Sequence, residues 1–320
     1  MKRHKIGKTG IEVTELSFGS SALGDMPDTY GYAVDEERAR QTLHAIFEGP
    51  VNMLDTSRVY GFGRSEERIG AAIRERGGLP EGLVISTKLD RDVETGRFDA
   101  AQAWRSLDQS LAALSLDKVQ ILHLHDPEHA ADLGEITGKG GALDTLFRMK
   151  EEGLTQAVGL AMGKIEMMLP ILKDWPFDAL INHNRYTLLN RAADEMYSWA
   201  HEAGMAIINA APFASGVLAK GTAHSNRLVY QAADEAALAP VRAVEAVCAA
   251  RGVELGAAAL RFSMRDERIA TTLVGVSRPE SIARDLAWAA AELPDELWTA
   301  LAELPHSTED PEASRVYRPG

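Results

Sequence analysis

Short β-rich segments alternate with amphipathic helical stretches along almost the whole chain, and this alternation is the strongest constraint on its fold. Eight such segments are expected to form strands, beginning at Glu15, Asn52, Leu83, Lys118, Ala157, Asp178, Ala206 and Thr271. Between them, apolar residues recur at helical spacing, as in Ala39, Leu43 and Ile46. Eight βα units predict an α/β fold, a (β/α)8 TIM barrel whose helices cover the outside of a closed parallel sheet. A doubly wound open sheet is the alternative, although it usually has fewer strands.

No linker or shift in composition marks a second domain, so we expect residues 1–320 to form a single domain. HKIGKTGIEV (residues 4–13) predicts an N-terminal β-hairpin turning at 8–10, placed to plug the lower end of the barrel. Asp35 and Ser65 occupy positions expected of helix N-caps, and Gly153 and Gly204 those of C-caps. Three long connections, 126–141, 214–239 and 305–320, are expected to act as functional lids.

The composition limits the kinds of molecule that this chain is expected to bind. The formal net charge of -13 argues against nucleic acid and anionic membranes, and favours a small-molecule substrate. No apolar run approaches the roughly 18 residues of a membrane span, and no signal-peptide core follows the N-terminal MKRHKIGKTG. The single cysteine, Cys248, is interpreted as a buried apolar side chain rather than a nucleophile. We therefore expect a cytoplasmic enzyme.

Ionisable residues gather where the expected strands end. Asp55, Lys88 and His125 each lie at the end of a different strand, and Tyr60 lies in the loop just beyond Asp55. Chemistry on a TIM barrel takes place at this edge. A neighbouring lysine ammonium favours the tyrosine phenolate, and a carboxylate holds that ammonium in place. Tyr60 is therefore predicted to act as an acid–base group, with His125 as a neutral hydrogen-bond partner for a substrate oxygen.

A metal site is the competing interpretation of HLHDPEH (residues 123–129). His123 and His125 point the same way on a strand, and H-x-H at a strand end begins the metal site of some barrel hydrolases. With His183 and Lys88 on other strands, a hydrolytic site is conceivable. The later strands end in Ala210 and Val276, which supply no ligand. We therefore expect no metal, and interpret His123 as a hydrogen-bonded histidine that lines the barrel.

The stretches DTSRVYG-x-GRSEERIG, ISTK and VQILHLHDP resemble the active-site motifs of the aldo-keto reductase family, in the same order and at comparable spacing. The resemblance covers nearly the whole chain, from KIGKTGIEVTELSFG to LVGVSRPESI. It implies a catalytic tetrad of Asp55, Tyr60, Lys88 and His125, and a nicotinamide cofactor bound extended across the barrel mouth. The glycines of YGFG lack the third glycine of a dinucleotide fingerprint, so we expect them to orient Tyr60 rather than to bind phosphate.

The resemblance also implies the cofactor contacts. They are Gly19, Asp55, Asn182, His183, Ala210, Pro212, Phe213, Ser215, Gly216, Gly275, Ser277, Arg278, Ser281 and Asp285. Several positions depart from the family pattern: Ala161-Met162 replace Ser-Asn, His183 replaces glutamine, Ala210 replaces a stacking aromatic residue, and Arg284-Asp285 replace Glu-Asn. Ser281 stands where NADP-selective relatives often carry arginine, which favours NAD, although Arg278 offers a partner for a 2′-phosphate.

The HDPEH loop and the stretch PFASGVL are similar to the branch of the family that contains aldose 1-dehydrogenases, which act on sugars such as L-fucose or D-galactose, and pyridoxal dehydrogenase. This branch implies oxidation of an anomeric hydroxyl to a lactone, with Tyr60 as the base. The expected substrate contacts are Tyr60, His125, Asp126, His129 and Arg58. Alternatives are a general aldehyde or ketone reductase, a pyridoxal dehydrogenase, and a nucleotide-binding regulatory subunit; the complete tetrad argues against the last.

Overall fold

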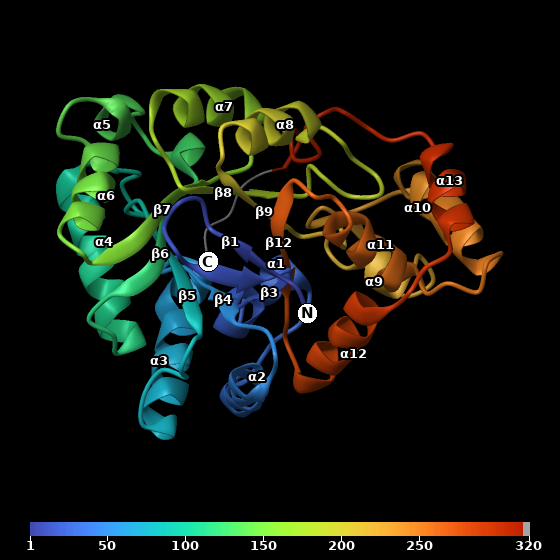
Figure 1. Cartoon of the computed structure of the whole chain (residues 1–320), viewed down its shortest axis with the longest axis horizontal. Helices are drawn as coiled ribbons and strands as arrows, with labels where there is room; N and C mark the ends of the chain where they lie inside the picture. Colours follow the sequence, from blue (N-terminus) through green and yellow to red (C-terminus); the bar gives the residue numbers. More distant parts are fainter. Residues whose placement is uncertain (316–320) are drawn as a thin grey trace.

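Eight parallel strands close into a barrel in the computed structural model, which describes residues 1–315 (Figure 1). In order around the barrel they are β3 (Leu16–Gly19), β4 (Met53–Asp55), β5 (Val84–Leu89), β6 (Val119–His125), β7 (Thr155–Ala161), β8 (Ala179–His183), β9 (Ala206–Ala210) and β12 (Ile269–Gly275). The pairing of β12 with β3, which sets Gly275 opposite Gly19, closes the ring. The predicted TIM barrel is confirmed.

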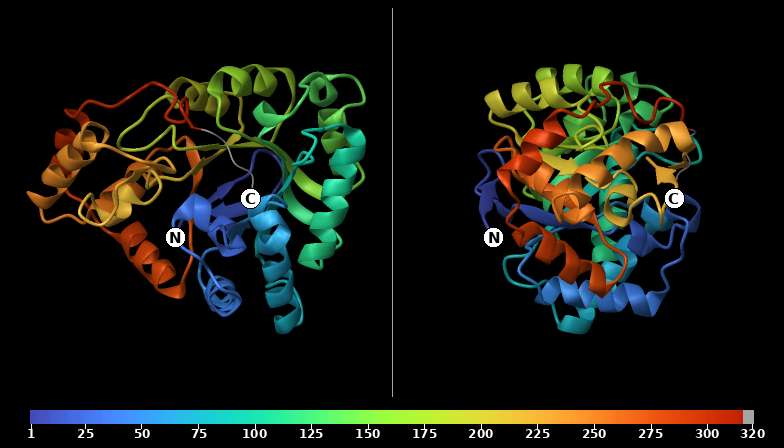
Figure 2. Two further views of the ribbon diagram at one scale, coloured as in Figure 1. Left: turned by 180° about the vertical axis from the view of Figure 1, so that it is seen from behind. Right: turned by 90° about the vertical axis from the view of Figure 1, so that its right-hand side faces the viewer.

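Helices surround the barrel on the outside (Figures 1 and 2). The long ones are α2 (Glu36–Glu48), α3 (Arg64–Arg76), α4 (Ala100–Leu114), α6 (Ala142–Glu151), α7 (Ile165–Asp174), α8 (Asp194–Glu202), α10 (Glu235–Ala249), α11 (Leu255–Met264), α12 (Pro279–Ala290) and α13 (Asp295–Ala302). Their buried faces and the outward-facing strand residues form one continuous apolar layer. No helix within residues 1–315 is long and apolar enough to cross a membrane.

The N-terminal hairpin plugs the barrel as predicted. Strands β1 (Arg3–Lys5) and β2 (Glu12–Thr14) pair in antiparallel fashion. Ile6, Ile11 and Val13 are buried in a second apolar cluster, together with Met53 and Val84, which begin β4 and β5. Because those residues lie at the starts of their strands, the hairpin closes the lower end of the barrel and leaves the other end open.

The structure confirms three of the four predicted caps. The Asp35 carboxylate accepts a hydrogen bond from the Arg38 amide at 2.8 Å, and Gly153 and Gly204 adopt left-handed backbone angles just after α6 and α8. The prediction for Ser65 is wrong. Helix α3 already begins at Arg64, and the Ser65 hydroxyl instead joins a buried hydrogen-bond network that includes Ser20 and Thr56.

The three long connections carry short elements and lie at the open end. Residues 126–141 hold η3 (Pro127–His129) and α5 (Gly134–Thr137). Residues 214–239 hold α9 (Val217–Lys220) and the hairpin β10–β11 (Arg227–Leu228, Gln231–Ala232) before α10. The described part of the tail, 305–315, returns from α13 toward the barrel, where Ser307 bridges to Asn190 (Figure 1). Residues 316–320 of the expected lid lie outside the described residues.

Gly70 allows α3 and α4 to pack closely, and this contact is testable. A Cβ at Gly70 would lie 1.9 Å from the carbonyl oxygen of Ala113. Alanine normally favours a helix interior over glycine by about 1 kcal/mol. We expect Gly70→Ala to lower the free energy of unfolding by about 1–3 kcal/mol instead, because the helices must separate. Chemical denaturation measures this.

The control for this prediction is Gly204→Ala, where nothing lies within 4 Å of the added methyl group. Only its left-handed backbone opposes that substitution. A Gly70→Ala protein as stable as the wild type would contradict the close contact.

Candidate active site

The carboxyl ends of the barrel strands surround one cavity of about 530 Å³. The final residues of seven strands line it: Gly19, Asp55, His125, Ala161, His183, Ala210 and Gly275. Lys88 and Tyr60 line the same cavity. The structure therefore brings together all four residues predicted to form the tetrad, at the edge where TIM-barrel chemistry takes place.

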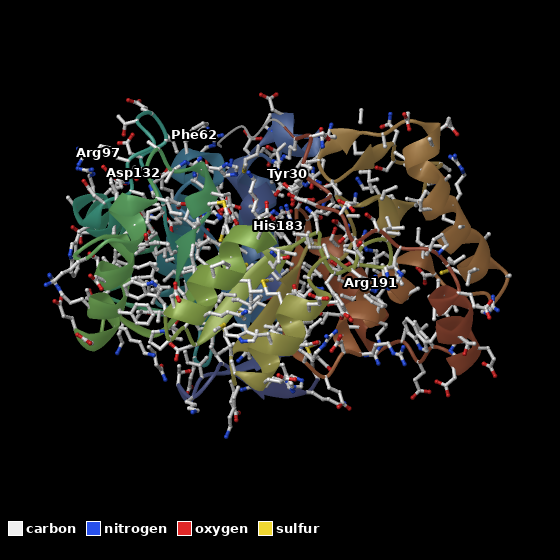
Figure 3. The ribbon with its side chains drawn as sticks, turned by 90° about the horizontal axis from the view of Figure 1, so that it is seen from above. Tyr30, Phe62, Arg97, Asp132, His183 and Arg191 are labelled. Atoms are coloured by element: carbon white, nitrogen blue, oxygen red, sulfur yellow. The ribbon has the colours of Figure 1, made fainter. Side chains whose placement is uncertain are left out.

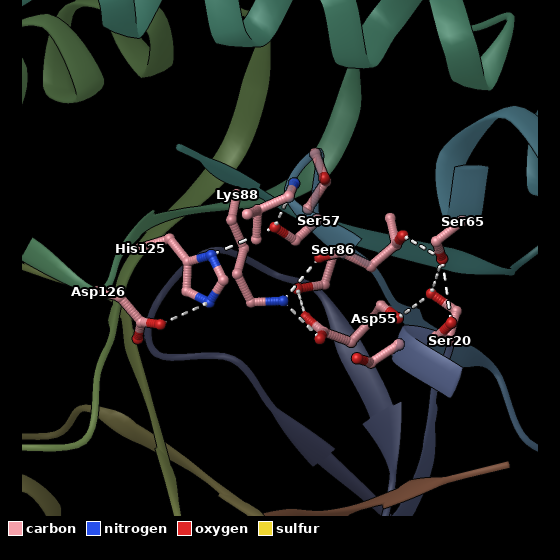
Figure 4. A network of polar contacts seen from close by, with 12 residues as sticks. Ser20, Asp55, Ser57, Ser65, Ser86, Lys88, His125 and Asp126 are labelled. Carbon is pink, nitrogen blue, oxygen red and sulfur yellow. Dashed lines mark hydrogen bonds and ion pairs between the residues drawn. The ribbon is translucent and has the colours of Figure 1, made fainter. Parts of the chain in front are cut away.

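Lys88 and Asp55 form an ion pair beneath the cavity (Figure 4). The Lys88 ammonium lies 2.6 Å from Asp55 Oδ2 and donates a second hydrogen bond of 2.6 Å to the Thr56 carbonyl oxygen. The other carboxylate oxygen of Asp55 accepts a hydrogen bond of 2.8 Å from the Ser86 hydroxyl. Both charged side chains are 3% exposed or less. Mutual pairing and these added hydrogen bonds compensate the cost of burying the two charges.

Tyr60 is held over this ion pair by an unusual turn. Gly61 and Phe62 have φ angles of 60° and 54°, and a Cβ at Gly61 would lie 1.9 Å from the Gly24 carbonyl oxygen. Only glycine fits at position 61, so the expected role of this glycine in orienting Tyr60 agrees with the backbone geometry. The Lys88 ammonium lies 4.8 Å from the centre of the Tyr60 ring, and the His125 ring meets it edge-on with centroids 5.8 Å apart.

The protonation of Tyr60 differs from the prediction. Burial and the Asp55 carboxylate raise the pKa of Tyr60 well above its usual value, whereas we expected Lys88 to lower it. The reason is that Asp55 neutralises the ammonium, so the phenol faces a desolvated pair rather than a lone positive charge. In this arrangement Tyr60 is a protonated phenol, ready to donate its proton.

His125 also differs from the prediction of a neutral ring. Its Nδ1 lies 2.6 Å from Asp90 Oδ1 and 3.2 Å from the Ser57 hydroxyl oxygen. Its Nε2 lies 3.6 Å from Asp126 Oδ2 (Figure 4). Burial alone lowers the pKa of His125, but the Asp126 and Asp90 carboxylates outweigh that effect and raise it. The sequence analysis missed Asp90. The only available signal was its position two residues after Lys88, just past the end of β5.

Most of the expected cofactor contacts line the cavity. They are Gly19, Asp55, His183, Ala210, Pro212, Phe213, Ser215, Gly216, Gly275, Ser277, Arg278 and Ser281. Asn182 and Asp285 are not among its lining residues. The Asn182 amide donates instead to the carbonyl oxygens of Met162 and Gly163, at 2.9 and 3.1 Å. Asp285 is buried in an ion pair with Arg284 at 2.8 Å.

Of the other expected substrate contacts, only Asp126 lines the cavity. Arg58 lies 3.1 Å from Glu67 and donates to the Gly63 carbonyl oxygen at 3.3 Å, so its guanidinium braces the start of α3. His129 belongs to η3 and does not line the cavity. Neither location could be derived from the sequence, because both depend on how the loops fold back.

Aromatic and basic residues that the sequence analysis did not select complete the cavity wall. They are Tyr30, Tyr32, Arg38, Lys220, Arg227, Tyr230 and Arg315. Arg227 joins two of the loops, because its guanidinium donates to the carbonyl oxygens of Thr29 at 2.9 Å and Tyr230 at 2.8 Å. Figure 3 shows Tyr30 and His183 near the middle of the molecule, with Arg97 and Asp132 at its periphery.

The geometry gives no support to a metal site. Within residues 1–315 no three His, Cys, Asp or Glu side chains are arranged to hold a metal ion. The expected hydrogen bonds of His123 are absent as well, since neither of its ring nitrogens has a partner among the described residues. Burial lowers the pKa of His123 well below its usual value, and Lys88 adds to this. His123 is therefore a neutral packing residue inside the barrel.

Glu312 fastens the tail to the cavity rim. Its Oε1 lies 2.9 Å from both His183 Nε2 and Arg185 Nη1, and its Oε2 lies 2.6 Å from Arg315 Nη1. Burial alone raises the pKa of Glu312, but His183 and Arg185 outweigh that effect and hold it far below its usual value. The carboxylate therefore stays charged and anchors the tail.

We expect Glu312→Gln to loosen the end of the tail, which Asp310 still ties to Arg185, and to lower the free energy of unfolding by about 1–3 kcal/mol, because it leaves the buried Arg185 short of one counter-charge. Since the pKa of Glu312 is depressed in the fold, its contribution is complete above the ordinary glutamate value of 4.5 and is lost as the pH falls below it. Limited proteolysis and thermal denaturation across pH 3–7 measure both effects.

The matched control is Glu309→Gln, since the Glu309 side chain is exposed. It should change neither tail cleavage nor stability. Equal sensitivity of the two variants to protease would contradict the role of Glu312.

Comparison with known proteins gives consistent matches. The Aldo/keto reductase family matches residues 15–305. The chain is 28% identical to pyridoxal 4-dehydrogenase of Microbacterium luteolum, over 94% of this chain and 96% of that protein. It is 29% identical to D-threo-aldose 1-dehydrogenase of a Pseudomonas species, over 92% and 94% of the two chains. The aldo-keto reductase AKR11C1 from Bacillus halodurans, in its holo form, shares the fold with a TM-score of 0.78 and 19% identity, over 99% of this chain and 100% of that one.

Proposed function

This chain belongs to the aldo/keto reductase family and is an NAD(P)-dependent oxidoreductase, and we propose that it oxidises the anomeric hydroxyl of an aldose to a lactone. The observation that carries the proposal is the buried Lys88–Asp55 pair beneath Tyr60 at the cavity floor. A tyrosine hydroxyl supported in this way suits proton exchange with an alcohol or carbonyl oxygen. The similarity to an aldose dehydrogenase points to a sugar as the donor of the hydride.

The cavity is lined by most of the residues expected to contact an extended dinucleotide. Its lining runs from the tetrad to Gly275, Ser277 and Arg278, at the end of β12 and just beyond it. Nothing lies within 4 Å of the position that a Cβ of Gly275 would take, so the backbone there is open to a ligand. When bound, the nicotinamide supplies the hydride acceptor for oxidation, or the hydride donor for reduction.

Each residue of the tetrad has a distinct part in this scheme. Tyr60 removes the proton from the anomeric hydroxyl as the C–H bond breaks, and returns it when the reaction runs backward. The Lys88 ammonium, 4.8 Å from the centre of the Tyr60 ring, offsets part of the negative charge of the phenolate that takes up this proton. Its pairing with Asp55 fixes the ammonium in place and leaves the pKa of Tyr60 raised. His125 donates a hydrogen bond to the same substrate oxygen. The raised pKa of Tyr60 means that oxidation accelerates with increasing pH.

NAD is the nucleotide that we propose as preferred. Ser281 brings no positive charge to the cavity. The nearby Arg284 is already paired with Asp285 at 2.8 Å and lies over the Trp288 ring at 4.5 Å. Arg278 and Arg38 are then the candidates for binding a 2′-phosphate, and the Nε of Arg38 is already bound to the Ser277 carbonyl oxygen at 2.8 Å.

The proposal is tested by assaying the purified protein on L-fucose, D-galactose, pyridoxal and simple aldehydes, each with NAD(H) and NADP(H). We expect the highest kcat/KM for an aldose with NAD. A preference for pyridoxal with NAD would instead indicate the activity named for the other relative, pyridoxal 4-dehydrogenase. Exclusive reduction of simple aldehydes would contradict the proposed aldose oxidation.

Tyr60→Phe tests the acid–base role directly. The substitution keeps the ring that packs beside His125 but removes the exchangeable proton. We expect kcat to fall by about 10²–10⁴-fold, with nucleotide affinity retained. Wild-type oxidation should rise from pH 6 to pH 10, whereas the residual rate of the variant should lack this rise. Retention of the full rate by Tyr60→Phe would overturn the assignment.

A further inference from the structure

Asp90 makes more contacts at the active site than the proposed mechanism uses. It lies just beyond β5, is 4% exposed, and accepts hydrogen bonds on both carboxylate oxygens. Oδ1 lies 2.6 Å from His125 Nδ1. Oδ2 accepts hydrogen bonds from the Ser57 hydroxyl at 2.6 Å and the Val59 amide at 3.0 Å. Asp90 therefore ties the histidine on β6 to the loop that carries Tyr60.

The backbone of Asp90 is fixed as firmly as its side chain. Its amide donates to the Ser106 hydroxyl at 2.9 Å, and its carbonyl oxygen accepts from the Gln102 side-chain amide at 2.9 Å. Both partners belong to α4, which is packed against the barrel. The carboxylate is held from two directions, so it presents a fixed acceptor to the imidazole.

This placement decides which nitrogen of His125 meets the substrate. A hydrogen bond from Nδ1–H to Asp90 leaves Nε2 as the atom that faces the cavity. It also favours the form of the ring that carries a proton on both nitrogens, because a carboxylate stabilises an adjacent imidazolium. A charged donor forms a stronger hydrogen bond to an oxygen that gains negative charge than a neutral donor does.

We propose that Asp90 is a positioning residue that holds His125 as an imidazolium, with Nε2–H directed at the substrate oxygen. The inference rests on the proposed oxidoreductase function and deepens it. His125 then stabilises negative charge on the reacting oxygen while Tyr60 exchanges the proton. In the direction of reduction, activity requires the charged ring and falls as the pH rises through the pKa of His125.

The groups that face His125 support this charge state on balance. Asp90 lies beside Nδ1, and Asp126 lies 3.6 Å from Nε2. Lys88 on β5 disfavours a positive charge on the ring, but its ammonium is itself paired with Asp55. His123 on β6 is neutral and adds no charge beside the ring. The edge-on ring of Tyr60 carries no charge while it is protonated. Two carboxylates therefore face the histidine against one compensated ammonium.

Asp90→Asn is the decisive variant. An asparagine oxygen still accepts a hydrogen bond from Nδ1–H, so the ring keeps its partner and loses the neighbouring charge. The asparagine NH2 group then faces Ser57 and Val59 and cannot accept the hydrogen bond of the Val59 amide, so some loss of stability accompanies the change. We expect the pKa of His125 to fall by about one to two units. It is followed by NMR of the full chain with ¹³C-labelled histidine, with the resonance assigned by His125→Gln. The upper limb of the kcat/KM–pH profile for aldehyde reduction should move to lower pH by the same amount.

A control variant keeps the test specific. Asp92→Asn makes the same chemical change two residues away, where the carboxylate accepts hydrogen bonds from the amides of Glu94 and Thr95. It should leave the pKa of His125 unchanged. Ser57 is unsuitable as a second variant, because its hydroxyl oxygen lies 3.2 Å from His125 Nδ1 as well as 2.6 Å from Asp90. If Asp90→Asn does not fold, ¹⁵N NMR of the wild-type chain is the test, and both ring nitrogens of His125 should carry a proton at neutral pH.

The results that would contradict the role of Asp90 differ from those that would contradict the proposed function. An unchanged His125 pKa in Asp90→Asn, or a His125 ring that is neutral at pH 7 in the wild type, overturns the role of Asp90. The NMR measurement needs no substrate, so it stands apart from turnover. Full turnover by Tyr60→Phe would instead overturn the proposed function, whatever the pKa of His125.

Discussion

The buried pairing of Lys88 with Asp55 is the interaction on which the open end of the barrel depends. A lysine ammonium and a carboxylate at the end of two adjacent strands are both almost fully buried, which is costly unless each finds its partner. The ion pair, with Ser86 and the Thr56 carbonyl oxygen, satisfies both groups. Once the pair is in place, it defines the floor of the cavity and the electrostatic field that Tyr60 experiences.

Charged side chains also connect the loops over the cavity. Arg227 links the β10–β11 hairpin to the segment after β3, and Glu312 links the tail to the end of β8. Asp90 links the end of β6 to the loop after β4. The barrel supplies the fixed strand ends, and these three contacts determine the position of the segments that must enclose a substrate.

Much of the fold and part of the site followed from the sequence. Alternating strand and helix patterns predicted the barrel, because each amphipathic helix can bury its apolar face only against a sheet. The convergence of Asp55, Lys88 and His125 followed from the rule that parallel strand ends share one edge. Arg58 and His129 were expected at the same edge, yet they do not line the cavity, because loop residues obey no such rule.

The sequence by itself therefore determined the closed barrel, its hairpin plug and the residues that converge on its mouth, since periodicity and strand ends are local features with fixed geometric consequences. Only the tertiary structure decided the electrostatic surroundings of the reacting groups. Burial and Asp55 raise the pKa of Tyr60 where Lys88 was expected to lower it, and two carboxylates raise the pKa of His125. Both depend on contacts between elements distant in sequence, such as Asp90 with His125, because a pKa responds to burial and neighbouring charge in three dimensions.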